Sequence, residues 1–237
     1  MNSPAKSSTA ATYSDYVFDR LRGDLVVGAF SPGARLAVKD LCERYRVGAS
    51  PVREALHRLA GERFVQFVGQ RGFRVPPLSL ADLDDLTDLR ALIEEAAVRQ
   101  AIARGDDSWE SGIVAAFYRL EREVGRFGSN DEVTVRRYDE VHREFHLSLY
   151  VGAVAPRLIE LHANLYDQAF RYRAMLHREP ISPADVLTEH RMLMARVLAR
   201  DTDASVQALR SHLELTRTLA RRHLQSTLTL QGGLLPR

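Results

Sequence analysis

The stretch VGASPVREALHRLAGE, residues 47–62, decides the fold of the first third of the chain. After a short turn, Ser50 is expected to cap a helix that begins at Pro51, because the first helical position does not need a backbone N–H. The helix is predicted to end near residue 60, with Arg53 and His57 on its exposed side. Its buried face is expected to hold Val52, Ala55 or Leu56, and Leu59.

Two further helices and a hairpin are predicted around this helix. Residues 13–28 form an amphipathic pattern that ends at Gly28, and residues 38–45 form a second, shorter one. The runs FVQFV and FRV alternate like strands around the turn GQRG, which puts Arg71 at the tip of a β-hairpin. This arrangement is a winged helix-turn-helix, whose third helix enters the major groove of DNA. The inward face of the first helix is expected to hold Tyr13, Tyr16 or Val17, Leu21 and Leu25.

The composition of the 237-residue chain is that of an ordinary soluble protein, with 45% hydrophobic and 27% charged residues. No apolar run approaches the roughly 20 residues that cross a bilayer. The first residues lack the apolar centre of a secretory signal, so the chain is expected in the cytoplasm with no membrane partner. One cysteine, Cys42, excludes an intrachain disulfide. Up to Pro77 there are 12 Lys and Arg against 7 Asp and Glu, and 21 against 24 afterwards, so the first segment suits a polyanion.

The chain after the Pro76-Pro77 break is predicted to be entirely helical. Six amphipathic segments joined by short loops predict an antiparallel all-α bundle, which makes the protein mainly α. The predicted bundle helices span residues 80–104, 111–126, 133–150, 156–177, 184–199 and 203 to about 224. The expected divisions are a disordered tail over 1–12, the winged helix-turn-helix over 13–76, the helical domain over 77–225 and a flexible tail over 226–237.

Four of the eight histidines fall on inward faces of these predicted helices. His142 and His146, in VHREFH, lie four residues apart, close enough on one helical face to bind one metal ion, although many isolated pairs of this kind bind nothing. His190 and His212 each lie in the apolar stripe of a later helix. A buried imidazole with unmatched nitrogens costs on the order of 1–3 kcal/mol. A divalent cation held by all four rings would remove that cost.

The run from Gly23 to Val75 closely resembles the N-terminal domain of GntR-type bacterial transcription regulators, in PG-x-x-L, PVREAL and RG-x-x-V. Family members usually carry Ser-Arg-Thr before PVRE, whereas this chain has Gly48-Ala49-Ser50. Because that arginine is missing at Ala49, the operator sequence of relatives does not carry over. The resemblance implies DNA contacts by Lys39, Arg53, Arg71 and Gly72, and the exposed side of the third helix adds Ser50 and His57.

Four later runs, DLRALIEEAAVRQA, HREFHLSLY, EHRMLMARVLARD and ALRSHLELT, resemble the C-terminal effector domain of FadR-type GntR regulators, called FCD. Many FCD domains hold a metal with Asp-x-x-x-His on one helix and one histidine on each of two later helices. His146, His190 and His212 match the histidine positions, and His142 stands at the aspartate position. Four nitrogens without a carboxylate favour Zn²⁺, with Ni²⁺ second, over Mg²⁺ or Mn²⁺.

The two resemblances imply a homodimeric repressor that binds a near-palindromic operator in double-stranded DNA through two half-sites. The helical domain is then the effector-binding and dimerisation domain. A metal with open coordination positions accepts carboxylates, so a small organic acid is the expected effector. Arg90, Arg171 and Arg173 are candidates to pair with its carboxylate, and a solvated helix face is the alternative for each.

Two other functions share these residues. A metal-dependent hydrolase is one, because HREFH resembles the HExxH motif. Glu144, however, follows His142 by two positions, roughly 200° round the helix, and therefore points away from a metal on the histidine face. A DNA-binding dimer is the other, in which the metal site is purely structural or the histidines bind nothing. Catalytic turnover would identify the hydrolase, and metal content separates a sensor from a dimer whose histidines bind nothing.

Overall fold

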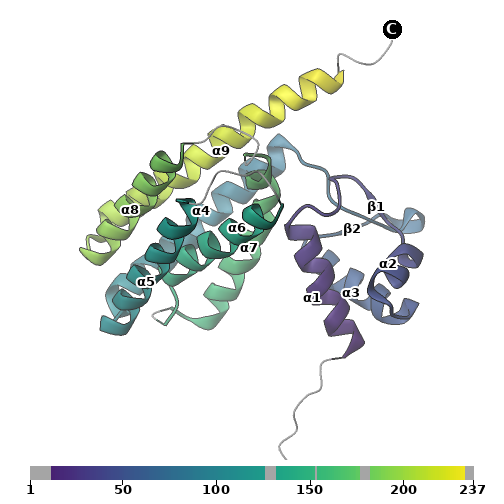
Figure 1. The fold of residues 1–237 in the computed structure, drawn as a ribbon, viewed down its shortest axis with the longest axis horizontal. Coiled ribbons are helices and arrows are strands. Elements are labelled where there is room, and N and C mark those ends of the chain that lie inside the picture. Colours follow the sequence, from purple (N-terminus) through teal and green to yellow (C-terminus); the bar gives the residue numbers. More distant parts are fainter. Residues whose placement is uncertain (1–11, 126–131, 153, 177–181, 233–237) are drawn as a thin grey trace, which may run out of the picture. The chain divides into compact units, whose positions relative to one another are not determined.

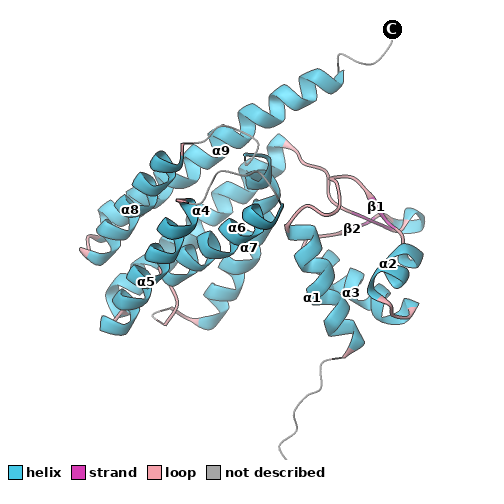
Figure 2. Cartoon of the chain, in the orientation of Figure 1, coloured by secondary structure: helices cyan, strands magenta, loops and turns pink. Residues whose placement is uncertain are grey.

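The computed structural model describes residues 12–125, 132–152, 154–176 and 182–232. Contacts divide the chain into two compact units, Met1–Pro77 and Leu78–Arg237. Each unit has a hydrophobic core of its own, so each is described by itself. Figure 2 shows that the strands of the described chain lie in the first unit and that the second unit is helical.

The first unit is a winged helix-turn-helix, as predicted (Figure 1). Its antiparallel sheet has the strand order β1-β3-β2, so a strand from before the second helix extends the predicted hairpin. That added strand has two residues, too few for alternation to reveal it in the sequence. The elements are α1 (Tyr13–Val26), β1 (Arg35–Leu36), α2 (Val38–Tyr45), α3 (Ala49–Gly61), β2 (Gln66–Phe67), a 3₁₀ turn (Gly69–Arg71) and β3 (Phe73–Arg74).

The start of α3 differs from the prediction. The helix begins at Ala49, its N-cap is Gly48 without a side-chain hydrogen bond, and Ser50 lies inside the first turn. Pro51 is tolerated there because the first four N–H groups of a helix have no intrahelical partner. The predicted cap at Ser50 is therefore wrong by two positions.

The core of the first unit forms where the three helices and the sheet meet. Val17, Leu21 and Leu25 of α1 are buried, so Val17 is the inward residue of the pair Tyr16 or Val17. Tyr13 is 75% exposed, so its predicted inward position is wrong. The aliphatic residues at spacing i, i+4 and i+8 already fill the inner face of α1. On α3 both alternatives hold, because Val52, Ala55, Leu56 and Leu59 are all fully buried.

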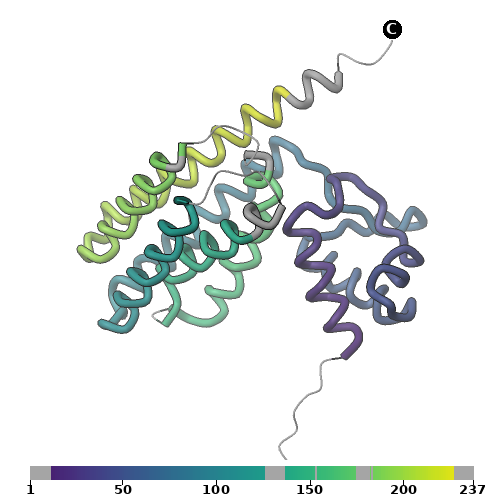
Figure 3. The backbone as a smooth tube through the Cα atoms, in the orientation of Figure 1, coloured from purple at the N-terminus to yellow at the C-terminus, as the bar shows by residue number. Residues whose placement is uncertain are grey.

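The second unit is the predicted bundle of six helices, within the described residues. Figure 3 follows the backbone of the last helix alongside the first one of the unit, and the two pack together. The last helix continues to Gly232, past its predicted end near Leu224 and into the segment expected to be a tail. Residues 1–11 of the expected tail over 1–12 lie outside the described residues. The helices are α4 (Leu80–Arg104), α5 (Asp107–Val124), α6 (Glu132–Ser148), α7 (Pro156–Leu176), α8 (Pro183–Leu198) and α9 (Thr202–Gly232).

The bundle core is mainly aliphatic and aromatic, with a polar region inside it. Asp106 caps α5 by accepting from the Trp109 backbone N–H at 2.9 Å, which starts that helix four residues before the predicted position. Trp109, Phe117 and Phe145 belong to the main apolar cluster. In the part of the chain that the structure describes, no helix is both long and apolar enough to cross a membrane.

Candidate metal centre and nucleic-acid interface

Four histidines from three helices converge inside the bundle. His142 and His146 lie one turn apart on α6, His190 lies on α8 and His212 on α9. One ring nitrogen of each lies within 4.8 Å of those of the other three. The first three are buried, and the side chain of His212 is 12% exposed. The structure therefore brings together all four residues that the sequence put forward as metal ligands.

The outer nitrogens of three of these rings have neighbours. His142 Nδ1 makes a hydrogen bond with the Tyr166 hydroxyl. His190 Nδ1 lies 2.6 Å from the Val186 carbonyl oxygen, to which it can only donate. His212 Nδ1 lies 3.7 Å from the Glu189 carboxylate. Contacts of this kind orient metal-binding histidines and leave the other nitrogen for the metal. Accordingly, the Nε2 atoms of His142 and His190 face each other at 2.9 Å.

His146 provides the test of whether this cluster fits a cation. Both of its ring nitrogens are buried and neither has a hydrogen bond within the described residues. Burial, together with the neighbouring imidazoles, holds the pKa of His146 well below its usual range, and burial lowers the pKa of His190 to about 3. Both rings are therefore neutral, as metal ligation requires. Nitrogens on a tetrahedral Zn²⁺ lie about 3.3 Å apart, and the donor nitrogens of the cluster lie within 4.8 Å of one another.

The three arginines expected to hold an effector lie in different places. The guanidinium of Arg173 lies over the Tyr166 ring at 4.0 Å and pairs with Asp139 at 3.3 Å. Arg90 lies 5.4 Å from the centre of the same ring. Arg171 pairs with Asp82 at 3.4 Å, and none of the four histidines is among its contacts. Two of the three candidates therefore lie against the tyrosine that contacts His142.

A buried ion pair on α4 was not foreseen from the sequence. Arg90 and Glu94 meet at 2.8 Å with side chains 6% and 1% exposed. Tyr150 donates to the Glu94 carboxylate at 3.2 Å, and His162 Nε2 lies 3.5 Å from it. Burial opposes ionisation of Glu94, but the charge of Arg90 and the nearby His162 ring outweigh it and lower its pKa from 4.5 to about 2. The i, i+4 spacing of the pair was visible in the sequence, whereas its burial was not.

The predicted DNA-facing residues of the first unit are solvent-accessible. Lys39, Ser50 and Arg53 are exposed, and the side chains of Lys39 and Arg53 form no ion pair with any described residue. His57 is exposed as well, but its ring packs edge-on against Phe73 at 4.9 Å. That contact ties α3 to the wing. The basic groups at the start of α2 and on the outer side of α3 therefore remain open to a partner.

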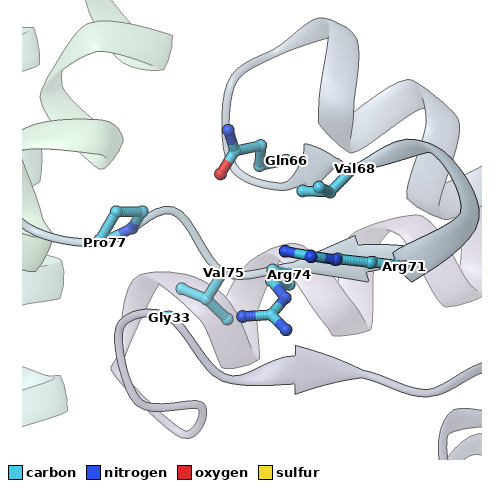
Figure 4. Close-up of a pocket in the computed structure, with 7 residues that line it drawn as sticks. All are labelled: Gly33, Gln66, Val68, Arg71, Arg74, Val75 and Pro77. Atoms are coloured by element: carbon cyan, nitrogen blue, oxygen red, sulfur yellow. The ribbon is translucent and has the colours of Figure 1, made fainter.

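The wing carries more unpaired arginines than the sequence suggested. Gly72 has a φ of 76°, which favours glycine, and this turn presents the exposed Arg71. Arg74 and Arg71 both line a groove of about 300 Å³, shown in Figure 4. Across the sheet, Arg35 stands directly opposite Arg74. Like charges in that position repel, which favours an anionic partner.

Glu144, the acid of the hydrolase alternative, lies on the surface. Its carboxylate accepts from Arg119 at 3.0 Å, and its side chain is 55% exposed. His142, His146 and His190 of the cluster are buried. The helical offset noted in the sequence thus carries this acid away from them, and a metal held by the histidines would have no general base in Glu144.

Two family models match the chain. The model described as bacterial regulatory proteins, gntR family, matches residues 13–75. The FCD domain model matches residues 85–215. Together they cover the two units, and both belong to transcription regulators and not to enzymes.

Individual proteins are similar over most of their length. BphR of Paraburkholderia xenovorans, an uncharacterized HTH-type transcriptional regulator, is 34% identical over 92% of this chain and 89% of its own. The HTH-type transcriptional repressor GlaR of Escherichia coli is 36% identical over 81% of this chain and 89% of its own. The solved structure of E. coli McbR/YncC has the same fold, with a TM-score of 0.75 at 24% identity over 91% of this chain and 100% of that one.

Proposed function

The chain belongs to the GntR family of bacterial regulatory proteins with an FCD domain and is a DNA-binding transcription regulator; from this premise we propose that it is a repressor whose operator affinity is set by a small organic acid at a metal site. The observation that carries the proposal is the cluster of four histidines. Their donor atoms lie within 4.8 Å of one another, deep in the bundle.

The proposed metal is Zn²⁺, with Ni²⁺ as the alternative, because all four donors are imidazole nitrogens. His142, His146, His190 and His212 would hold it. A bound cation of this kind supplies a Lewis acid that accepts a carboxylate oxygen. The neutral state of His146 and His190 supports this assignment, because protonated rings would repel a cation.

Arg90 and Arg173 are the proposed partners of the acid. Both guanidinium groups lie against Tyr166, whose hydroxyl contacts His142. Each already pairs with an internal carboxylate, Glu94 or Asp139, so an incoming acid would have to compete for them. Arg171 is a weaker candidate, because its contacts are with Asp82 and the Gln168 carbonyl.

DNA binding is proposed to use Lys39, Ser50, Arg53, His57, Arg71 and Gly72 in a homodimer on a near-palindromic operator. One recognition helix reads too few bases for selectivity in a genome, so two copies on two half-sites are needed. Arg53 lies near the start of α3, the end of a recognition helix that meets base edges. The acid would release DNA only if it binds more tightly to an arrangement of the dimer that mis-spaces the two helices.

Metal analysis of protein purified without a nickel column tests the proposed metal site. We expect about one divalent ion per chain and a lower melting temperature after chelation. The matched control is the His146→Ala, His190→Ala double variant, which should contain no metal. A metal content near zero in the wild type, with no effect of the chelator on melting, would reject the metal site.

Titration of small carboxylic acids tests the proposed control by an organic acid, with melting temperature and operator binding as readouts. An effector should raise the melting temperature of the wild type and weaken its operator binding. In the double variant the acid should change neither the melting temperature nor operator binding. If it binds acids as well as the wild type does, the metal is structural and the acid acts elsewhere.

A further inference from the structure

The turn that joins α2 to α3, residues 46–48, has an arginine where the backbone favours glycine. Arg46 follows the last residue of α2 with φ 57° and ψ 46°, the left-handed conformation that a side chain disfavours and glycine accepts. Its side chain is exposed and forms no hydrogen bond or ion pair with any residue that the structure describes. Nothing within the unit therefore accounts for an arginine at this position.

A neighbouring arginine at the same end of α2, Arg44, does have a structural role. Arg44 pairs with Asp24 at 2.7 Å and lies over the Phe30 ring at 5.2 Å. Arg44 thus ties α2 to α1 and to the loop before β1. Arg46, two residues later, makes no such tie, and its strained backbone is retained without any internal gain.

The glycine of this turn stands where the backbone does not need one. Gly48 has φ −74° and ψ 170°, an extended conformation open to any residue. A Cβ built on it would meet no atom within 4 Å. Neither its conformation nor a close contact inside the unit requires glycine here. Glycine is a favoured N-cap residue, and its bare backbone also permits the close approach of another molecule.

We propose that the turn Arg46–Gly48 is a phosphodiester-binding element, in which Arg46 pairs with a DNA phosphate and Gly48 lets the strand approach. Arg46 precedes the first residue of α3 by three positions, a chain distance of at most about 10 Å. A guanidinium matches the geometry of a phosphate and pairs with it through two N–H groups. A phosphate contact carries no sequence information, so the turn would position α3 and Arg53 would read the bases.

The test uses full-length protein, an operator duplex selected in vitro with the wild type, and a random-sequence duplex of equal length. Arg46→Gly should weaken binding to both duplexes by roughly eightfold per lost contact at 0.1 M salt and reduce the salt slope by about 0.9 per contact. Its melting temperature should equal or exceed that of the wild type, because glycine relieves the left-handed backbone. Arg46→Lys keeps the charge and should retain most of the salt slope.

The other end of α3 offers matched controls. Arg63 is also exposed and left-handed, with φ 63°, and Gly61 also has open space around its Cβ position. Arg63→Gly and Gly61→Ala should leave affinity for both duplexes unchanged, whereas Gly48→Ala should weaken it. The proposal is overturned if Arg46→Gly keeps wild-type affinity, if it melts at a lower temperature, or if Arg63→Gly loses as much binding.

Discussion

The arginines around α3 and those inside the helical bundle differ in what balances their charge. Arg53 and Arg71 are exposed and form no ion pair within the described residues. Arg90 is buried and the side chain of Arg173 is 11% exposed; both lie over a tyrosine ring, and each has a carboxylate within 3.3 Å. A buried charge must be paired inside the fold, whereas an exposed charge is solvated and stays free to pair with a bound ligand. Unpaired arginines therefore mark the surface for a polyanion, whereas an acid that binds Arg90 or Arg173 must compete with the carboxylate already there.

The largest expected effect is on the buried pair. Arg90→Met should destabilise the bundle by about 3–5 kcal/mol, because it leaves the Glu94 carboxylate buried without its partner. Urea unfolding followed by circular dichroism measures the free energy of unfolding. The double variant Arg90→Met, Glu94→Leu removes both charges and should recover most of the loss. A loss below about 1 kcal/mol in the single variant would contradict the distinction drawn between the two kinds of arginine.

The same pair predicts a pH dependence. The folded-state pKa of Glu94 is lowered from 4.5 to about 2, which corresponds to about 3 kcal/mol of stability. Because the folded pKa is the lower one, this stability is present above pH 4.5 and is lost as the pH falls towards 2. The difference in unfolding free energy between wild type and Glu94→Gln should shrink over that range. A difference that stays constant from pH 5 to pH 2 would show that Glu94 is not the group responsible.

Arg53→Ala should abolish specific operator binding. Loss of a base contact costs about 1–3 kcal/mol per half-site, and the proposed dimer would bind two. Stability should change by less than about 0.5 kcal/mol, because the side chain is exposed and unpaired. A gel shift with a selected operator measures the binding. Wild-type affinity in this variant would remove Arg53 from the interface.

Arg71→Ala should act on affinity alone, and equally on every sequence. A lost phosphate contact reduces the slope of log affinity against log salt by about 0.9, with similar loss on operator and random duplexes. Fluorescence anisotropy between 50 and 200 mM salt measures that slope. A loss confined to the operator would make Arg71 a base-reading residue instead.

The smallest effect is expected at an exposed pair of the bundle. Arg119 and Glu144 meet at 3.0 Å, with side chains 51% and 55% exposed. Solvent screens such pairs, so Arg119→Ala should cost less than about 1 kcal/mol. Metal content should also stay the same, because Glu144 lies away from the histidines. A larger loss would show that solvent exposure does not indicate how much an ion pair of this protein contributes to stability.

Local sequence patterns were sufficient for most of the secondary structure. The predicted limits of α2 and α4 agree with the observed helices, because helical periodicity depends on residues within one or two turns. The start of α3 and the end of α9 were misplaced, at Ser50 and near Leu224. Caps and last turns depend on a few weak interactions, and so they are the least determined parts of a helix.

The candidate metal ligands were accessible to sequence reasoning for two different reasons. The spacing of His142 and His146 alone places both rings on one face of α6. His190 and His212 lie on other helices, and only the inward stripe of each and the family resemblance linked them to the pair. The contacts that orient these rings were missed. Tyr166 lies 24 residues from His142, and no local sequence pattern predicts a contact between residues so far apart.

By itself, the sequence determined a DNA-reading helix with a basic wing, a helical bundle and an inward pair of histidines, since each follows from spacing along one element. Only the tertiary structure decided which charges are balanced. The sequence predicted Arg53 on the exposed side of its helix and shows Glu94 four residues after Arg90, but it did not show that this pair is buried. Packing buries Arg90 beside Glu94 and leaves Arg53 in solvent. Burial and long-range pairing depend on segments far apart in the chain, so they exist only once the helices are packed together.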